Sequence, residues 1–143
     1  MRRVGGVWQK PVERLDHGYF ADWSPDGRSL AFGSSLSDGS LWVMPADSGP
    51  PRLVTDSAGP RGIVGNGSRW SSDGRSLYTR TDSGGITSYW SIPLDRRPPQ
   101  RLFTFDPNGP VPTRGGWATA QGKLVYAASE QRSDIWVMDV VTP

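Results

Sequence analysis

The sequence predicts an all-β fold, a β-propeller in which one chain supplies three four-stranded antiparallel blades. A tryptophan recurs every 47 residues, at Trp23, Trp70 and Trp117. Short apolar runs separated by turn signals follow each of these tryptophans, and no stretch shows the 3.6-residue apolar period of a helix. A repeat of this length with about four strands per unit is typical of propeller blades.

The repeat extends beyond the three tryptophans. Each one is followed after seven residues by a leucine, namely Leu30, Leu77 and Leu124. A second tryptophan follows after 19 or 20 residues, and these are Trp42, Trp90 and Trp136. Residues that recur at one structural phase are expected to pack between neighbouring units. We therefore interpret six of the seven tryptophans as packing anchors and leave Trp8 outside the full repeats.

The first unit shows the expected strands most clearly, at residues 19–24, 29–34, 40–45 and 52–55. The SPDG sequence at residues 24–27 predicts a hairpin turn, because proline presets φ and glycine accepts a positive φ. The SSDG sequence at residues 71–74 repeats the turn without the proline. In the third unit the glycine moves to Gly122, so we expect a different turn there.

Composition excludes several classes of function. Cysteine is absent from the 143 residues, and His17 is the only histidine. Disulfides, iron–sulfur clusters, cysteine-held zinc and multi-histidine metal sites are therefore excluded. The net charge of +2 comes from 16 basic and 14 acidic residues that are spread along the chain, which does not favour a nucleic-acid surface. The apolar runs are too short to insert into a membrane.

The sequence lacks the motifs of the common catalytic sites. It contains neither a Gly-x-Ser-x-Gly nucleophile elbow nor a P-loop. A serine triad would need His17 as its base, and the short loop around His17 favours a structural hydrogen bond instead. The aspartate-containing loops at residues 35–40 and 81–85 lack the oxygen spacing of a calcium site. We expect no enzyme activity, no cofactor and no metal.

The first unit carries the motifs WSPDGRxLAFxS, LWVMxxD and PxRLVT, and variants of them recur in the same order at nearly the same spacing across residues 19–140. On these motifs the blades resemble those of TolB-type β-propellers, which are WD-repeat-like. The resemblance implies a propeller, often six-bladed, whose blade motif holds no catalytic residue. It also implies three settings: the periplasmic Tol system, propellers that gate prolyl-oligopeptidase-like or tricorn-type peptidases, and sensor halves of bacterial regulators.

The strand count raises the question of how such a ring closes. We expect one module with an N-terminal closing strand in residues 1–18, blade 1 at 19–65, blade 2 at 66–112, and blade 3 at 113–143 without its own last strand. Residues 12–15 resemble the last strands of the other blades. Because propellers have roughly four to eight blades, we expect two copies to form a six-bladed ring as a homodimer. The rival interpretation is a fragment of a longer propeller.

The expected function is binding of protein or peptide ligands by a non-catalytic scaffold, through its face loops or its central channel. First strands line the channel of a propeller, and Asp22, Arg69 and Gly116 precede the anchor tryptophans there. The loops that enter the first strands, at residues 17–19, 57–68 and 106–114, are the other candidate surface. The candidate contact residues are His17, Tyr19, Asp22, Arg61, Asn66, Arg69 and Arg114.

Two other functions stay open. One is an accessory or gating propeller fragment of a larger peptidase, and the other is the sensor half of a bacterial regulator. The start MRRVGGVWQK lacks the apolar stretch of a signal peptide, so the cytoplasm is the expected compartment. The periplasm is expected if the natural start lies upstream of Met1.

Overall fold

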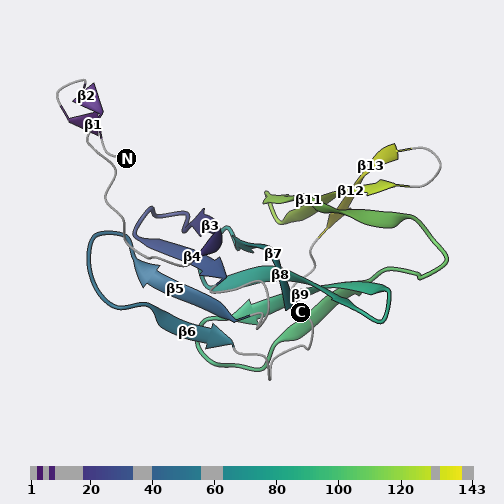
Figure 1. The fold of residues 1–143 in the computed structure, drawn as a ribbon, viewed down its shortest axis with the longest axis horizontal. Coiled ribbons are helices and arrows are strands. Elements are labelled where there is room, and N and C mark those ends of the chain that lie inside the picture. Colours follow the sequence, from purple (N-terminus) through teal and green to yellow (C-terminus); the bar gives the residue numbers. More distant parts are fainter. Residues whose placement is uncertain are drawn as a thin grey trace.

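The structure, a computed structural model, describes residues 3–4, 7–8, 18–33, 40–55, 63–129 and 133–139 (Figure 1). Every regular element within these ranges is a β-strand, and neighbouring strands pair antiparallel. The predicted all-β class is confirmed. The same ranges hold no helical segment with the length and apolarity that spanning a membrane requires.

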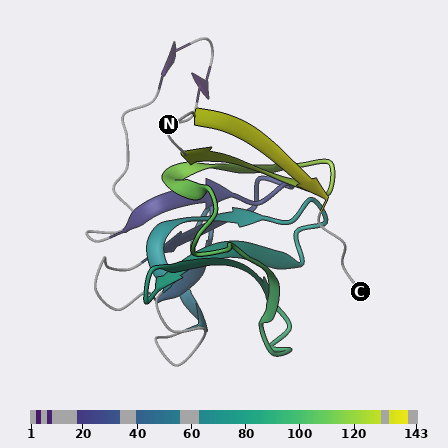
Figure 2. The same cartoon turned by 90° about the vertical axis from the view of Figure 1, so that its right-hand side faces the viewer.

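Three larger sheets follow one another along the chain, each with its strands in chain order. Sheet 1 contains β3 (Tyr19–Trp23), β4 (Ser29–Gly33), β5 (Leu41–Pro45) and β6 (Arg52–Thr55). Sheet 2 contains β7 (Ile63–Trp70), β8 (Ser76–Ser83), β9 (Ile86–Pro93) and β10 (Gln100–Thr104). Sheet 3 contains β11 (Val111–Ala120), β12 (Lys123–Ser129) and β13 (Ser133–Asp139). Figure 1 shows them around an arc with β3, β7 and β11 toward its inside, and Figure 2 shows sheet 3 as a layer above sheet 2.

The described part of the N-terminal segment is a small hairpin. Its strands β1 (Arg3–Val4) and β2 (Val7–Trp8) pair with each other. In Figures 1 and 2 the hairpin stands apart from the three sheets. The predicted closing strand at residues 12–15 lies outside the described residues, and sheet 3 has three strands among those that are described.

Local sequence signals placed the strands of sheet 1 to within one residue of their observed bounds. The predicted hairpin turn is also present: Gly27 donates its backbone N–H to the carbonyl of Ser24 at 2.9 Å and has φ of +69°. Inside the turn, the Ser24 hydroxyl donates to Asp26 Oδ1 at 2.6 Å. The turn at residues 71–74 has the same bonds, so its missing proline is not required for the geometry.

The third hairpin differs from the first two, as the displaced glycine predicts. Gln121 and Gly122 form a two-residue turn with φ of +52° and +72°, and Ala120 pairs with Lys123. Two positive φ values in a two-residue loop are the signature of a type I′ turn. Because this turn is tighter, β11 continues past Trp117 by three residues and carries the hairpin toward sheets 1 and 2.

The loops expected at residues 57–68 and 106–114 are shorter than predicted. β7 already begins at Ile63, where Ile63 pairs with Thr81, and β11 begins at Val111, which pairs with Ser129. Asn66 and Arg114 therefore lie in strands, and their assignment to loops is wrong. The reason is that β8 and β12 extend beyond the repeat motif and offer pairing partners to residues upstream of a bulge.

Each tryptophan of the 47-residue series lies on the first strand of a sheet, but their surroundings differ. Trp70 packs on sheet 1 in a core with Ala31, Leu41 and Val43, and it is 7% exposed. Trp117 packs on sheet 2 beside Tyr89, with ring centroids 5.2 Å apart, and is 4% exposed. Trp23 lies on the first of the three larger sheets, belongs to neither of the described core clusters and is 56% exposed. Burial of these indoles therefore depends on the preceding sheet.

Candidate ligand-binding site

A pocket of about 400 Å³ lies where the last residues of β3 and β7 meet the β11–β12 hairpin. Three consecutive sheets contribute to it, because their first strands share the inner side of the arc (Figure 1). Its charged and aromatic lining residues are Asp22, Trp23, Arg69, Trp70, Tyr78 and Lys123. A concave site with a few polar groups among aromatic side chains is the usual form of a small-ligand or peptide site.

Asp22 fixes one wall of the pocket. Its Oδ2 accepts a hydrogen bond from the backbone N–H of Trp70 at 3.2 Å, and its carbonyl accepts from Trp70 Nε1 at 3.1 Å. Both bonds run from sheet 2 to sheet 1. The Asp22 carboxylate is therefore used to hold two sheets together, which reduces its capacity to bind a ligand.

Arg69 supplies a positive charge on the next wall. Its guanidinium carbon lies 5.4 Å from the centre of the Trp117 ring, and its Nη1 donates to the Ser68 carbonyl at 3.0 Å. A cation over an indole face is stabilised by about 0.5–2 kcal/mol. The side chain thus spans from β7 to β11, with its charge held at a fixed position beside the pocket.

Lys123 and Tyr78 complete the polar lining. Lys123 Nζ lies 2.5 Å from Asp139 Oδ1, and both side chains are largely exposed. Burial, and to a smaller extent the Asp73 carboxylate, raise the pKa of Tyr78, so its hydroxyl stays a hydrogen-bond donor at neutral pH. The lining thus contains two cations and one carboxylate. Lys123 is paired with Asp139, so the positive charge available to a ligand is mainly that of Arg69.

A second pocket of about 480 Å³ lies between the first hairpins of sheets 1 and 2. Its carboxylates belong to Asp26 and Asp73, which are bonded within their turns. The hydrogen bond from Ser24, followed by the backbone N–H of Arg28, lowers the pKa of Asp26; Ser71 and Arg75 do the same to the pKa of Asp73. Because these groups serve the turns, we place the candidate site in the first pocket.

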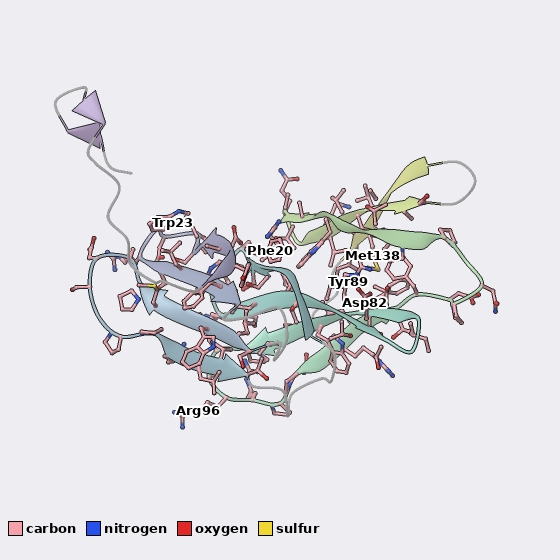
Figure 3. The ribbon with its side chains drawn as sticks, viewed as in Figure 1. Phe20, Trp23, Asp82, Tyr89, Arg96 and Met138 are labelled. Carbon is pink, nitrogen blue, oxygen red and sulfur yellow. The ribbon has the colours of Figure 1, made fainter. Side chains whose placement is uncertain are left out.

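A buried polar cluster joins sheets 2 and 3 outside the pocket. Arg80, whose side chain is 3% exposed, donates through Nη1 to the Thr113 carbonyl at 2.8 Å and through Nη2 to Asp82 Oδ1 at 2.9 Å. Thr87 Oγ1 also donates to Asp82 Oδ1, at 2.6 Å. Tyr89, labelled in Figure 3, belongs to the core cluster against which Met138 of sheet 3 packs. The bond from Arg80 to Thr113 crosses from β8 of sheet 2 to β11 of sheet 3, so the cluster forms a brace between the two sheets. Asp82 Oδ2 is buried there without a hydrogen-bond partner.

Of the predicted site residues, Asp22 and Arg69 line the pocket together. Tyr19 is exposed on β3 but is not among the lining residues. Asn66 and Arg114 lie on β7 and β11, while His17 and Arg61 lie outside the described residues. Sequence reasoning missed Tyr78 and Lys123. The signal for Lys123 was available, because it directly follows the displaced Gly122 that predicted an altered hairpin.

Among the residues that the structure describes, no group of three or more histidine, cysteine, aspartate or glutamate side chains could hold a metal ion. The sequence matches no family model and no curated protein.

Similar structures are found among known proteins. The β-propeller domain of the Trilobed protease from Pyrococcus furiosus superposes with a TM-score of 0.55 over 87% of this chain and 41% of that one, at 15% identity. The AtxE2 isopeptidase with Astexin3-dC4 bound superposes with a TM-score of 0.55 over 80% of this chain and 18% of that one, at 14% identity.

These likenesses, together with the antiparallel sheets, establish the fold class as a β-propeller. At such identities they establish the fold alone. The chain spans about two fifths of the Pyrococcus furiosus propeller domain and less than a fifth of the isopeptidase.

Proposed function

We propose that this chain is a non-catalytic β-propeller scaffold that binds a protein or peptide segment in the pocket between β3, β7 and β11. The observation that carries the proposal is the convergence of Arg69 and Lys123 with three aromatic side chains around one cavity of about 400 Å³. The resemblance of the blades to TolB-type propellers supports a scaffold role, since that blade motif holds no catalytic residue. Binding through the central channel is favoured over binding through the face loops, because Asn66 and Arg114 lie in strands.

The chemistry of the lining favours an acidic peptide. Arg69 can donate hydrogen bonds in a fork that matches a carboxylate, and the surrounding rings of Trp23, Trp70 and Tyr78 suit apolar neighbours of that acid. The Asp22 carboxylate is held against sheet 2 by the backbone N–H of Trp70 and keeps its negative charge, so the preference depends on Arg69. A peptide with an aspartate between small residues therefore fits the site better than its asparagine or lysine counterpart.

The test uses three acetylated, amidated peptides of sequence Gly-Ala-X-Ala-Gly in which X is aspartate, asparagine or lysine. Binding is followed by NMR, through the indole N–H signals of Trp23 and Trp70. We expect the aspartate peptide to bind about two- to five-fold tighter than the asparagine peptide, because a half-exposed charge pair contributes about 0.5–1 kcal/mol. The lysine peptide binds weakest.

Arg69→Gln should remove the preference for aspartate, and Arg97→Gln is the matched control. Arg97 pairs with Asp95 at 2.9 Å on the surface, and it is not among the residues that line the pocket. Urea unfolding of both variants checks that the fold is intact. The proposal fails if none of the peptides moves the indole signals at millimolar concentration, or if Arg97→Gln removes the preference as fully as Arg69→Gln.

A second candidate function is an accessory propeller of a larger peptidase. It is favoured by the two structural neighbours, since one is a protease propeller domain and the other an isopeptidase. An antibody raised against this chain distinguishes the two functions in an extract of its natural source. Detection of a protein near 15.6 kDa supports the separate scaffold. Detection of a much larger protein, together with hydrolase activity in the material that the antibody captures, supports the peptidase.

A further inference from the structure

The two sheets at the ends of the arc expose surfaces that are buried in the middle of the arc. Within the chain, sheets 1 and 2 each receive the tryptophan of the following sheet at one cross-strand pair of residues. Ala31 and Val43, which are opposite each other on β4 and β5, receive Trp70. Tyr78, which lies opposite Ser91 on β8 and β9, packs with Trp117. All six of these side chains are at most 8% exposed.

The equivalent positions at the ends are less buried, with Val125 half-buried and Val137 and Trp23 exposed. On sheet 3 the equivalent pair is Val125 and Val137, which are opposite each other on β12 and β13. Their neighbours Leu124 and Met138 face sheet 2, so Val125 and Val137 face the other way, and Val137 is 60% exposed. At the opposite end Trp23, the equivalent of Trp70 and Trp117, is 56% exposed, and no sheet among the described residues receives it.

We propose that Trp23 of one copy packs on the Val125–Val137 pair of a second copy, so that two chains join at two identical joints and close a ring of six sheets. The proposal continues the interface that sheets 1 and 2 already form inside the chain. Among the residues that the structure describes, each copy offers both halves of the joint, the exposed Trp23 and the Val125–Val137 pair, so a second copy can cover both ends. Trp23 and the neighbouring Phe20 are seen on β3 in Figure 3.

The join is head to tail, and this has a structural consequence. Contacts of this kind close only when the rotation between subunits completes a circle, and otherwise they continue into open chains. Three sheets per chain would complete a ring of six with two copies, which falls within the known range of roughly four to eight blades. The assembly goes beyond ligand binding and does not depend on it, so failure of the peptide experiment leaves it intact.

Light scattering after size exclusion tests the assembly. The chain of 15.6 kDa is expected to elute with twice that mass. Trp23→Ala and Val137→Asp are each expected to give the monomer mass, because either change damages both joints. Ile86→Asp is the matched control for the second variant, since Ile86 is 40% exposed on β9 and belongs to neither end surface. It is expected to keep the dimer mass.

Mixing the two variants makes the test specific to a head-to-tail join. In a mixed pair, one joint carries both substitutions and the other carries none. An equimolar mixture of Trp23→Ala and Val137→Asp should therefore recover the dimer mass, although each variant alone is monomeric. Circular dichroism of the tryptophans confirms that the variants are folded.

Three results would overturn the proposal. One is a folded wild-type chain that is monomeric at about 100 μM, which is roughly a hundred times a micromolar dissociation constant. This result would favour further blades of a longer chain as the natural cover of the two end sheets. Another is a series of masses above the dimer, which would show joining without closure. The third is a mixture that stays monomeric.

Discussion

The Nε1–H of Trp70 donates to the backbone carbonyl of Asp22 at 3.1 Å, and this bond joins the first strands of two different sheets. The same indole packs on the face formed by Ala31 and Val43. One side chain thus supplies both a directed bond and an apolar contact between neighbouring sheets. Tryptophan suits this double role at position 70, because it combines a large ring with a single donor.

Trp70→Ala should destabilise the chain far more than Trp23→Ala. Removal of the buried Trp70 ring leaves a cavity and leaves the Asp22 carbonyl without its donor. We expect the free energy of unfolding to fall by about 3–5 kcal/mol. The exposed Trp23 should cost less than about 1 kcal/mol. Urea unfolding at a protein concentration low enough to keep the chain monomeric measures both values. Equal losses at the two positions would show that the sheets do not depend on this contact.

Arg80 and Asp82 allow a test of the buried brace between sheets 2 and 3. Arg80→Met leaves the Asp82 carboxylate without its cation, and we expect a loss of about 3 kcal/mol. The double variant Arg80→Met, Asp82→Leu removes both charges and should be more stable than the single variant. A double-mutant cycle from urea unfolding gives the coupling energy. Strictly additive losses would contradict a direct interaction.

The contrast between Trp70 and Arg80 shows what the sequence could and could not predict. Trp70 belongs to a local pattern of a tryptophan, a turn and a leucine, so its strand and its packing role follow from nearby residues. Arg80 lies in the polar run Thr79-Arg80-Thr81-Asp82, which is typical of a solvated strand, yet Arg80 is 3% exposed. Its burial depends on Thr113, which is 33 residues away and belongs to another sheet.

The candidate pocket was predictable to a similar, limited extent. Asp22 and Arg69 could be placed on first strands from the repeat, and both line the pocket. Tyr78 could not, because its position there depends on how three sheets are packed. For Lys123 the displaced Gly122 indicated an altered hairpin, but only the packing of the sheets brings that hairpin to the pocket. Local signals therefore located the strands of sheet 1, but they missed the early starts of β7 and β11, and the composition of the site followed from the arrangement of the sheets.

Tyr89 predicts a loss of stability at alkaline pH. Burial is the main cause that raises its pKa to about 12, while the Arg80 charge has a smaller opposite effect. Its hydroxyl is buried without a hydrogen-bond partner of good geometry. The unfolded chain releases the phenol proton near pH 10, whereas the folded chain holds it until about pH 12. The contribution of the protonated Tyr89 phenol to stability is therefore complete below about pH 10 and is lost as the pH rises toward 12.

Tyr89→Phe should remove this part of the alkaline loss and leave the stability at pH 7 nearly unchanged, since no hydrogen bond is broken. Urea unfolding between pH 8 and about 12, together with phenolate absorbance, measures both effects. If the variant and the wild type lose stability in parallel over this range, the Tyr89 phenol does not control the transition. If the variant is several kcal/mol weaker at pH 7, its hydroxyl has a bonding partner after all.

The positive φ of Phe20 is expected to reverse the usual order of stability between glycine and alanine at position 20. It has φ of +54°, which disfavours side chains with a Cβ, and the residue 47 positions later is Gly67 with φ of +90°. Both residues lie in the stretch where the first strand shifts its register before the anchor tryptophan. In an ordinary strand, alanine is more stable than glycine by roughly 0.5–1 kcal/mol.

At position 20 we expect Phe20→Gly to be more stable than Phe20→Ala by about 1 kcal/mol, because only glycine accepts this backbone conformation without strain. Both variants lose the same ring, so the comparison isolates the backbone. The matched control is Leu53 on β6, because its exposure of 44% is close to the 49% of Phe20. At position 53 the alanine variant should be more stable than the glycine variant. Alanine being favoured at both positions would mean that the positive φ of Phe20 carries no strain.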